Sequence, residues 1–337
     1  MNIKTTLILL CALLAFSAVA QDNGQLKNRQ YRTMERYSHI SENSLITDVM
    51  QHPAFNDWGS LIFPWDDRRR YARNMTMADA PSLHLWHTNM HVGKMVDGVN
   101  RMIDDINKGE NVFYDFYSDK EKNAEPTKKR TGLFFFRGKQ DAPFAVICPG
   151  GGFYYVGSLH EGFPLAMELN RKGYNAFVLK YRVGQGVSHE KQASQDLIAA
   201  VDYIRSHAHE LRVSPHNYSV WGGSAGARMC SNATYGEGGI KRTDVLHPAA
   251  AVIAYTYFAG HPSFNRKDPP AYLIVGTDDW IVPHEEVRER AKEMRATGID
   301  VECHILRHTQ HGFGVGEGTP AEGWMNQAVE FWERHFH

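Results

Sequence analysis

The stretch that most constrains the fold of this 337-residue chain is residues 218–230. Residues 218–221 make a short strand-like run, and the next five are Gly222-Gly223-Ser224-Ala225-Gly226, a G-x-S-x-G pattern followed by a segment that can be helical. A serine on so sharp a strand-to-helix turn needs small residues two positions before and after it. Such a turn lifts the hydroxyl over the sheet and directs the first N–H groups of the helix at whatever the serine attacks. The pentapeptide is weak evidence alone, but its context favours a nucleophile elbow.

Strand-like and helix-like segments alternate from residue 111 onward. Strands are expected at residues 112–117, 131–136, 144–148, 174–181, 218–221, 249–255, 271–275 and 301–306. Helices are expected from Pro164 to Gly173, at 191–210, from about Val287 to a cap at Gly298, and at 324–336, with a charged loop at 121–130. This alternation predicts an α/β fold with a mostly parallel central sheet and helices on both faces, its first two strands running in opposite directions. Right-handed crossovers then gather the loops that follow the strands at one edge of the sheet.

Residues 21–110 are predicted to be an N-terminal extension of the 111–337 catalytic domain. Residues 92–103 have helical periodicity, and Thr88 or Asn89 is the expected cap. His84, His87 and His91 are spaced at i, i+3 and i+7, which permits a metal site on a helix. A continuous helix is doubtful there, so histidines that pack or line a cleft are the favoured interpretation.

The first residues resemble a targeting signal. Lys4, an apolar run at 7–16 and Ala18-Val19-Ala20 predict a signal peptide of residues 1–20, cleaved after Ala20, and hence a secreted or periplasmic protein without membrane insertion after cleavage. Three cysteines then remain: Cys148, Cys230 and Cys303. An odd number argues against a disulfide framework, although one pair can form, and no Cys/His spacing suggests zinc.

The charge balance limits the classes of partner. The formal net charge is -1, and no Lys/Arg stripe offsets it, so the chain lacks the electrostatic footprint of a nucleic-acid or anionic-membrane binder. A small or neutral substrate is expected, and the oligomeric state is left open.

An elbow serine needs a base, and the base needs an orienting carboxylate. His311 follows the last predicted strand, and Asp279 follows the strand before it. Asp278 competes with Asp279, and His308 competes with His311, but the order Ser, Asp, His is the order of this fold. We therefore predict Ser224, Asp279 and His311 as a catalytic triad.

Attack by a serine on a carbonyl also needs hydrogen-bond donors for the oxyanion. The Gly150-Gly151-Gly152 run follows a strand expected to lie beside the elbow strand, where glycine lets the backbone approach closely and leaves N–H groups free. The N–H of Ala225, directly after the nucleophile, is the other expected donor.

Several motifs together resemble a known family. They are Cys-Pro-Gly-Gly-Gly-Phe at 148–153, Gly-Tyr-Asn-Ala-Phe-Val-Leu-Lys-Tyr-Arg at 173–182, the elbow, the run at 269–283 that holds Gly-Thr-Asp-Asp-Trp, and His-Gly-Phe-Gly at 311–314. The chain looks like an α/β-hydrolase esterase over residues 111–337, similar to the secreted bacterial acetyl-xylan and feruloyl esterase-like group. The resemblance implies an oxyanion hole of Gly151, Gly152 and Ala225. Pro149 replaces the histidine of the family's His-Gly-Gly-Gly motif, and Ala227 stands where a third glycine often follows the elbow.

The expected function is that of a secreted serine esterase that works through an acyl-enzyme, without metal or organic cofactor. The expected substrate is a small-molecule or oligosaccharide ester carrying an acetyl or hydroxycinnamoyl group. Tyr154, Tyr155 and Trp280 are candidates for lining the substrate pocket, or else core aromatics. If the site is covered, residues 21–110 are the expected cover. The rival interpretations are a peptidase of the prolyl-oligopeptidase type and a non-catalytic binding protein on the same fold.

Overall fold

The computed structural model describes residues 36–65, 70–184, 187–241, 243, 246–258, 260 and 262–337. The predicted signal peptide lies outside these residues. Residues 39–337 form one compact unit, and residues 36–38 are grouped with the N-terminal segment. Within the described part of the chain, no helix is long and apolar enough to cross a membrane.

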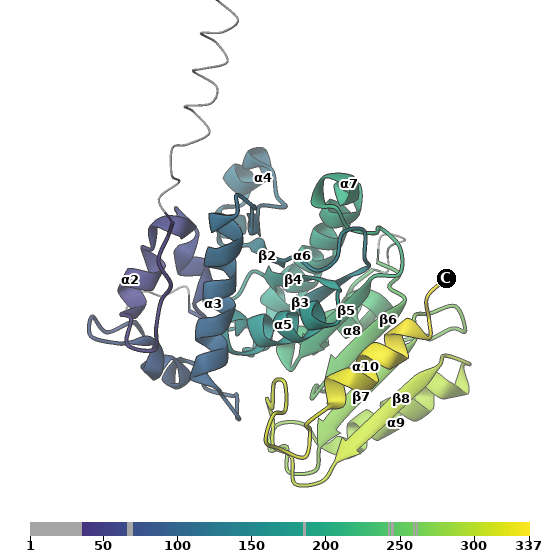
Figure 1. Ribbon diagram of the computed structural model, residues 1–337. Coiled ribbons are helices and arrows are strands. Elements are labelled where there is room, and N and C mark those ends of the chain that lie inside the picture. Colours follow the sequence, from purple (N-terminus) through teal and green to yellow (C-terminus); the bar gives the residue numbers. More distant parts are fainter. Residues whose placement is uncertain are drawn as a thin grey trace, which may run out of the picture. The chain divides into compact units, whose positions relative to one another are not determined.

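The described strands form one sheet of eight in the order β1-β2-β4-β3-β5-β6-β7-β8 (Figure 1). They are β1 (Phe113–Tyr114), β2 (Gly132–Phe136), β3 (Phe144–Cys148), β4 (Asn175–Lys180), β5 (Ser219–Gly223), β6 (Ala250–Ala254), β7 (Ala271–Gly276) and β8 (Val301–Leu306). The pairings of β2 with β1 and with β4 are antiparallel, and every pairing from β4 to β8 is parallel. The prediction of a mostly parallel sheet that begins with strands of opposite direction is confirmed.

Among the parallel strands β3 to β8, the chain reverses its direction of travel across the sheet once, after β4. Helix α5 (Phe163–Arg171) connects β3 to β4, whereas α6 (Val187–Ser206), α8 (Ala225–Tyr235) and α9 (His284–Ala296) lie on connections that move the other way. Because parallel crossovers are right-handed, this reversal places α5 on the face opposite α6, α8 and α9. The last helix, α10 (Trp324–Glu333), lies in front of β6 and β7 in Figure 1.

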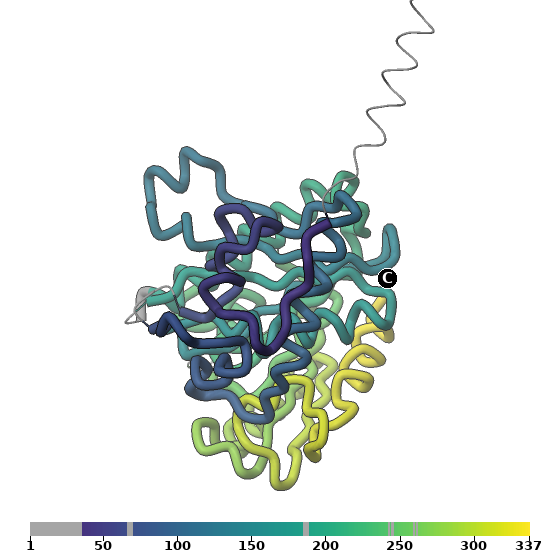
Figure 2. Tube along the Cα trace, turned by 60° about the vertical axis from the view of Figure 1, so that its left-hand side comes forward, coloured from purple at the N-terminus to yellow at the C-terminus, as the bar shows by residue number. Residues whose placement is uncertain are grey.

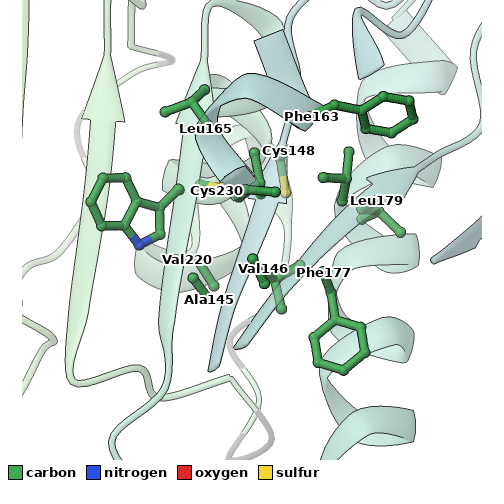
Figure 3. Packing of buried hydrophobic residues seen from close by; sticks show 14 of the residues in the cluster. Ala145, Val146, Cys148, Phe163, Leu165, Phe177, Leu179, Val220 and Cys230 are labelled. Carbon is green, nitrogen blue, oxygen red and sulfur yellow. The ribbon is translucent and has the colours of Figure 1, made fainter. Parts of the chain in front are cut away.

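The central strands of the sheet are fully buried and mostly apolar. Every residue of β3, β4 and β5 is buried, as expected for parallel strands that are covered on both faces. Figure 3 shows Cys148 of β3 and Cys230 of α8 within this packing, beside Leu165 and Leu179. Both thiols are buried and free, whereas Cys303 is partly exposed.

Described residues of the N-terminal extension belong to the same compact unit as the sheet. Helix α3 (Val92–Asn107) packs on α5, where Gly98 allows the approach: a Cβ there would lie 2.8 Å from the Cβ of Phe163. The fully buried Lys180 of β4 donates hydrogen bonds to the carbonyls of Phe63 at 2.9 Å and Pro64 at 3.2 Å. The extension therefore covers part of the core.

The expected charged loop at 121–130 is wrong. The structure has helix α4 (Asp119–Ala124) followed by a 3-10 helix at Pro126–Arg130. Ser118 and Glu121 form a reciprocal capping box at the start of α4. This Ser-x-x-Glu signal is visible in the sequence and satisfies two of the N–H groups left open at a helix start.

The expected cap of α3 is also wrong. His91 precedes the helix without a side-chain cap. Thr88 instead donates its hydroxyl to the carbonyl of His311 at 2.7 Å, and Asn89 donates to the carbonyl of Glu317 at 2.9 Å. Figure 2 shows the blue N-terminal trace beside the yellow segment that follows β8. These side chains therefore join two distant parts of the chain, which local sequence signals do not reveal.

Candidate active site

Ser224 sits at the junction of β5 and α8 in a strained backbone conformation. Its φ of 50° and ψ of -118° lie in a region that residues other than glycine rarely adopt, at a typical cost of about 1–3 kcal/mol. Its N–H donates to the carbonyl of Ala254 at 3.0 Å. A Cβ on Gly222 would lie 2.4 Å from the N of Ala227, and one on Gly226 would lie 1.8 Å from the carbonyl oxygen of Cys148. The glycines two residues before and after the serine are therefore sterically required.

The loops that follow β7 and β8 bring Asp279 and His311 to Ser224. His311 Nε2 lies 2.9 Å from Ser224 Oγ, and His311 Nδ1 lies 2.8 Å from Asp279 Oδ2. The other carboxylate oxygen, Oδ1, accepts the backbone N–H groups of Ile281 and Val282 at 2.9 and 2.8 Å. Because a carboxylate only accepts, Nδ1 carries the imidazole proton, and Nε2 is left to accept the serine hydroxyl. The side chains of His311 and Asp279 are fully buried, so water does not compete for these bonds.

The competing residues lie elsewhere. Asp278 and His308 face each other at the surface, with 3.6 Å between His308 Nδ1 and Asp278 Oδ2. The His308 side chain is 84% exposed. Neither has a recorded contact with Ser224, so the alternative choices of acid and base find no support in the geometry.

The glycine loop after β3 lies directly beside the elbow. Strand β3 pairs in parallel with β5, and Cys148 is in register with Gly222. Gly151 and Gly152 have φ of 135° and 61°, which favour glycine at both positions. Within the described residues, the N–H groups of Gly151, Gly152 and Ala225 have no recorded acceptor in the protein. The donors expected for an oxyanion are thus available for a ligand.

The three aromatic candidates for substrate contact divide into two groups. Trp280 and Tyr154 are 56% and 48% exposed, and the Trp280 ring centroid lies 6.1 Å from that of His311. Tyr155 is fully buried, and its ring stacks on Trp86 at 5.5 Å. Tyr155 is therefore a core aromatic, which was the alternative interpretation, and it offers no surface to a substrate in this conformation.

The buried histidine group contains His160 in place of the predicted His91. The rings of His84 and His87 contact that of His160, with centroids 5.6 and 5.0 Å away, and all three side chains are buried. Burial, followed by the charge of His87, lowers the pKa of His84 to about 3. No group of three or more His, Cys, Asp or Glu residues suited to a metal ion occurs in the described part of the chain. The imidazole rings pack against one another, as in the favoured interpretation.

Glu161 is a fully buried carboxylate behind the site that the sequence did not single out. Its Oε2 accepts the N–H of Gly150 at 2.5 Å, and its Oε1 accepts the hydroxyl of Tyr255. His87 Nε2 lies 3.6 Å from Oε1. Burial raises the pKa of this carboxyl, but the contacts with His87, Tyr255 and Gly150 lower it more, so the net pKa is below its usual value. Glu161 stands only three residues before Pro164, and no local pattern distinguishes it from an ordinary helix-start acid.

Comparisons with known proteins identify relatives of this chain. The BD-FAE family model matches residues 136–244. Endo-1,4-beta-xylanase B of Butyrivibrio fibrisolvens is 24% identical over 214 residues, 53% of this chain and 34% of that protein. The acetylxylan esterase of Xylanibacter ruminicola is 22% identical over 203 residues, 51% of this chain and 41% of that protein. The matched regions span less than half the length of either curated relative.

The fold is also that of a solved structure, which this chain matches over almost the full length of that structure. The acetyl ester-xyloside bifunctional hydrolase from Caldicellulosiruptor lactoaceticus superposes with a TM-score of 0.55 at 21% identity, covering 66% of this chain and 95% of that chain. Likeness at this identity shows the fold. The protein has the α/β-hydrolase fold, and its resemblance to esterases of the acetyl-xylan and feruloyl esterase-like group is confirmed by the family model and the two curated relatives.

Proposed function

We propose that this protein is a serine carboxylic-ester hydrolase. The observation that carries the proposal is the continuous chain of hydrogen bonds from Ser224 through His311 to Asp279. Beside this chain lie the N–H groups of Gly151, Gly152 and Ala225, which donate to no acceptor among the described residues. Positioned nucleophile, base, orienting carboxylate and oxyanion donors are what acyl transfer requires.

The reaction would proceed in two halves. Ser224 Oγ attacks the ester carbonyl while His311 Nε2 takes its proton, and the negative charge on the carbonyl oxygen is held by the N–H groups. His311 then gives the proton to the departing alcohol, which leaves an acyl group on Ser224. Water, deprotonated by His311, attacks the acyl-enzyme, the acid departs and the proton returns to Ser224. Asp279 stays ionised and holds the imidazolium in place.

The substrate class we propose is an acetylated or hydroxycinnamoylated sugar from plant polysaccharide, or a related small ester. One relative is an acetylxylan esterase and one solved neighbour is an acetyl ester-xyloside hydrolase, which favours a sugar-borne acetyl group. Exposed Trp280, next to Asp279, offers an apolar face against which a sugar ring can pack. Such a polymer is found outside cells, so we also propose secretion or a periplasmic location.

The test is fluorophosphonate labelling of the mature protein beside a Ser224→Ala control. We expect labelling of the wild type alone, followed by turnover of p-nitrophenyl acetate and of acetylated xylo-oligosaccharides. Cleavage of a prolyl amide in preference to these esters would favour the peptidase instead. A well-folded wild type that neither labels nor turns over any ester would overturn the proposal and favour a binding protein.

A further inference from the structure

Glu161 contacts several parts of the candidate site and is itself fully buried. It lies in a single π-helical turn, Ser158–Gly162, a local geometry that is frequent at functional sites. A Cβ added to Gly223 would lie 2.3 Å from Glu161 Oε1, so the carboxylate packs directly against the strand that carries the nucleophile. A charged side chain with no access to water is costly unless each oxygen has partners.

One carboxylate oxygen fixes the loop that holds the oxyanion donors. Oε2 accepts the N–H of Gly150, and the carbonyl of the same residue accepts the N–H of Gly157 at 2.9 Å. Both peptide planes that flank Gly150 are therefore held, and the next N–H groups along the chain belong to Gly151 and Gly152. Gly150 is also close to the nucleophile, because a Cβ there would lie 3.1 Å from the Cβ of Ser224. A shift of this loop by a fraction of an ångström would misdirect the donors.

The other oxygen reaches the base through Tyr255. This residue directly follows β6 with φ of 40°, and its hydroxyl donates to Oε1. The Tyr255 ring packs edge-on against His311 at 5.2 Å between centroids, and against Phe313 at 4.6 Å. Holding the hydroxyl therefore holds the ring against which the imidazole rests.

The N-terminal extension reaches Glu161 through His87. His87 Nε2 lies 3.6 Å from Oε1, and His87 Nδ1 shares a 2.9 Å hydrogen bond with the hydroxyl of Tyr155. Thr88, the next residue, is bound through its N–H to the carbonyl of Gly312 at 3.1 Å. The extension thus reaches the back of the site at two adjacent residues.

We infer that Glu161 is a positioning residue, which holds the oxyanion loop and, through Tyr255, His311 against the elbow, with His87 of the extension packed beside its Oε1. The inference rests on the proposed esterase function. On this view, residues 87 and 88 complete the hydrolase site from behind, whether or not other parts of the extension cover it.

The test uses four variants of the full mature chain: Glu161→Gln, Glu161→Ala, His87→Gln and His87→Ala. Their active sites are titrated with a fluorophosphonate, and their turnover of p-nitrophenyl acetate is then measured. We expect kcat per titrated site to fall about 10- to 100-fold in Glu161→Ala, with KM within about twofold, because the loss of oriented oxyanion donors affects the transition state. Glu161→Gln, which keeps an acceptor for Gly150, should recover part of this loss. His87→Gln, which keeps a donor toward Glu161, should be milder than His87→Ala.

Glu237→Gln is the matched control. Glu237 is also a buried carboxylate, and it accepts from Arg290 at 2.8 Å and from Ser231 at 2.6 Å, both outside the site. Loss of a residue with a merely structural role lowers the melting temperature and the titrated fraction but leaves kcat per site unchanged. We expect this result for Glu237→Gln.

The outcomes separate the two proposals. If the wild type labels at Ser224 and hydrolyses the ester while both Glu161 variants keep wild-type kcat per site, the positioning role is wrong and the esterase function stands. If the wild type itself is inert, the function fails first. Should Glu161→Ala not fold, Tyr255→Phe removes a single hydrogen bond to the same oxygen, and an unchanged kcat per site there would overturn the inference.

Discussion

Asp279 and Asp278 are adjacent in sequence and differ completely in environment. Asp279 is buried, accepts two backbone N–H groups and binds His311, whereas the Asp278 side chain is 49% exposed and faces His308. Which of the two carboxylates contacts His311 is thus set by the shape of one turn.

Asp279→Asn should therefore lower kcat per titrated site by about three to four orders of magnitude. The amide can donate to His311 and so favour the wrong tautomer, an effect of about this size in serine proteases. The measurement is p-nitrophenyl acetate turnover with a Ser224→Ala blank. Asp278→Asn is the control and should stay within about twofold, and equal losses in the two variants would contradict the assignment.

The junction of β5 and α8 depends on a glycine as much as on its serine. The chain passes so close to β3 at this point that Gly226 has no room for a side chain beside Cys148. The obstacle is backbone, so a rotamer change cannot relieve the overlap, and either β3 or the helix start must move.

Gly226→Ala is expected to lower the free energy of unfolding by about 1–3 kcal/mol or more. It should also lower kcat per titrated site, because Cys148 leads directly into the glycine loop. Urea unfolding and active-site titration measure the two effects. Gly93→Ala in α3 is the matched control, since the nearest atom to its added Cβ is at 3.8 Å and alanine favours a helix by about 0.5–1 kcal/mol. A Gly226→Ala protein as stable and active as the wild type would show that the junction is looser than described.

At the level of the complete fold, the histidine group links the extension to the sheet. His84 belongs to the extension and His160 to the turn after the glycine loop, and burial is the largest cause that lowers both pKa values. Near His84 are the charges of His87, Glu161 and Lys180. The folded chain keeps these imidazoles neutral, whereas the unfolded chain can protonate them. Acid therefore favours the unfolded state.

This predicts a pH-dependent stability with a definite sign. The pKa of His84 falls from about 6.5 in the unfolded chain to about 3 in the folded one. Between these values the unfolded state binds more protons, so the free energy of unfolding decreases as the pH falls from 6.5 toward 3, by up to about 1.4 kcal/mol per pH unit for this histidine. Urea titrations from pH 7 to 4.5 should give a shallower slope for His84→Asn than for the wild type. His308→Asn, at an exposed histidine, should leave the slope unchanged, and parallel curves for all three proteins would refute the prediction.

Much of the architecture follows from local pattern. The strand at Val301–Leu306 has its predicted bounds, β3 does as well, and the elbow lies between a strand and a helix as its small residues require. Buried parallel strands are continuous apolar runs, and such runs can be recognised without knowledge of their neighbours. Residues 121–130 are rich in charge, but the capping signal of Ser118 and Glu121 is local and indicates the helix that the structure has there.

Other features exist only because distant segments meet. Motif order indicates a serine, an acid and a base, since loops after parallel strands share one edge of the sheet. The choice between Asp278 and Asp279, the partners of Thr88, and the burial of Tyr155 depend on contacts across long stretches of chain. Glu161 is the clearest case: its partners Gly150, His87 and Tyr255 come from three separate segments. Local sequence carries periodicity and turn chemistry, whereas the neighbours of a buried charge are set when the whole chain packs.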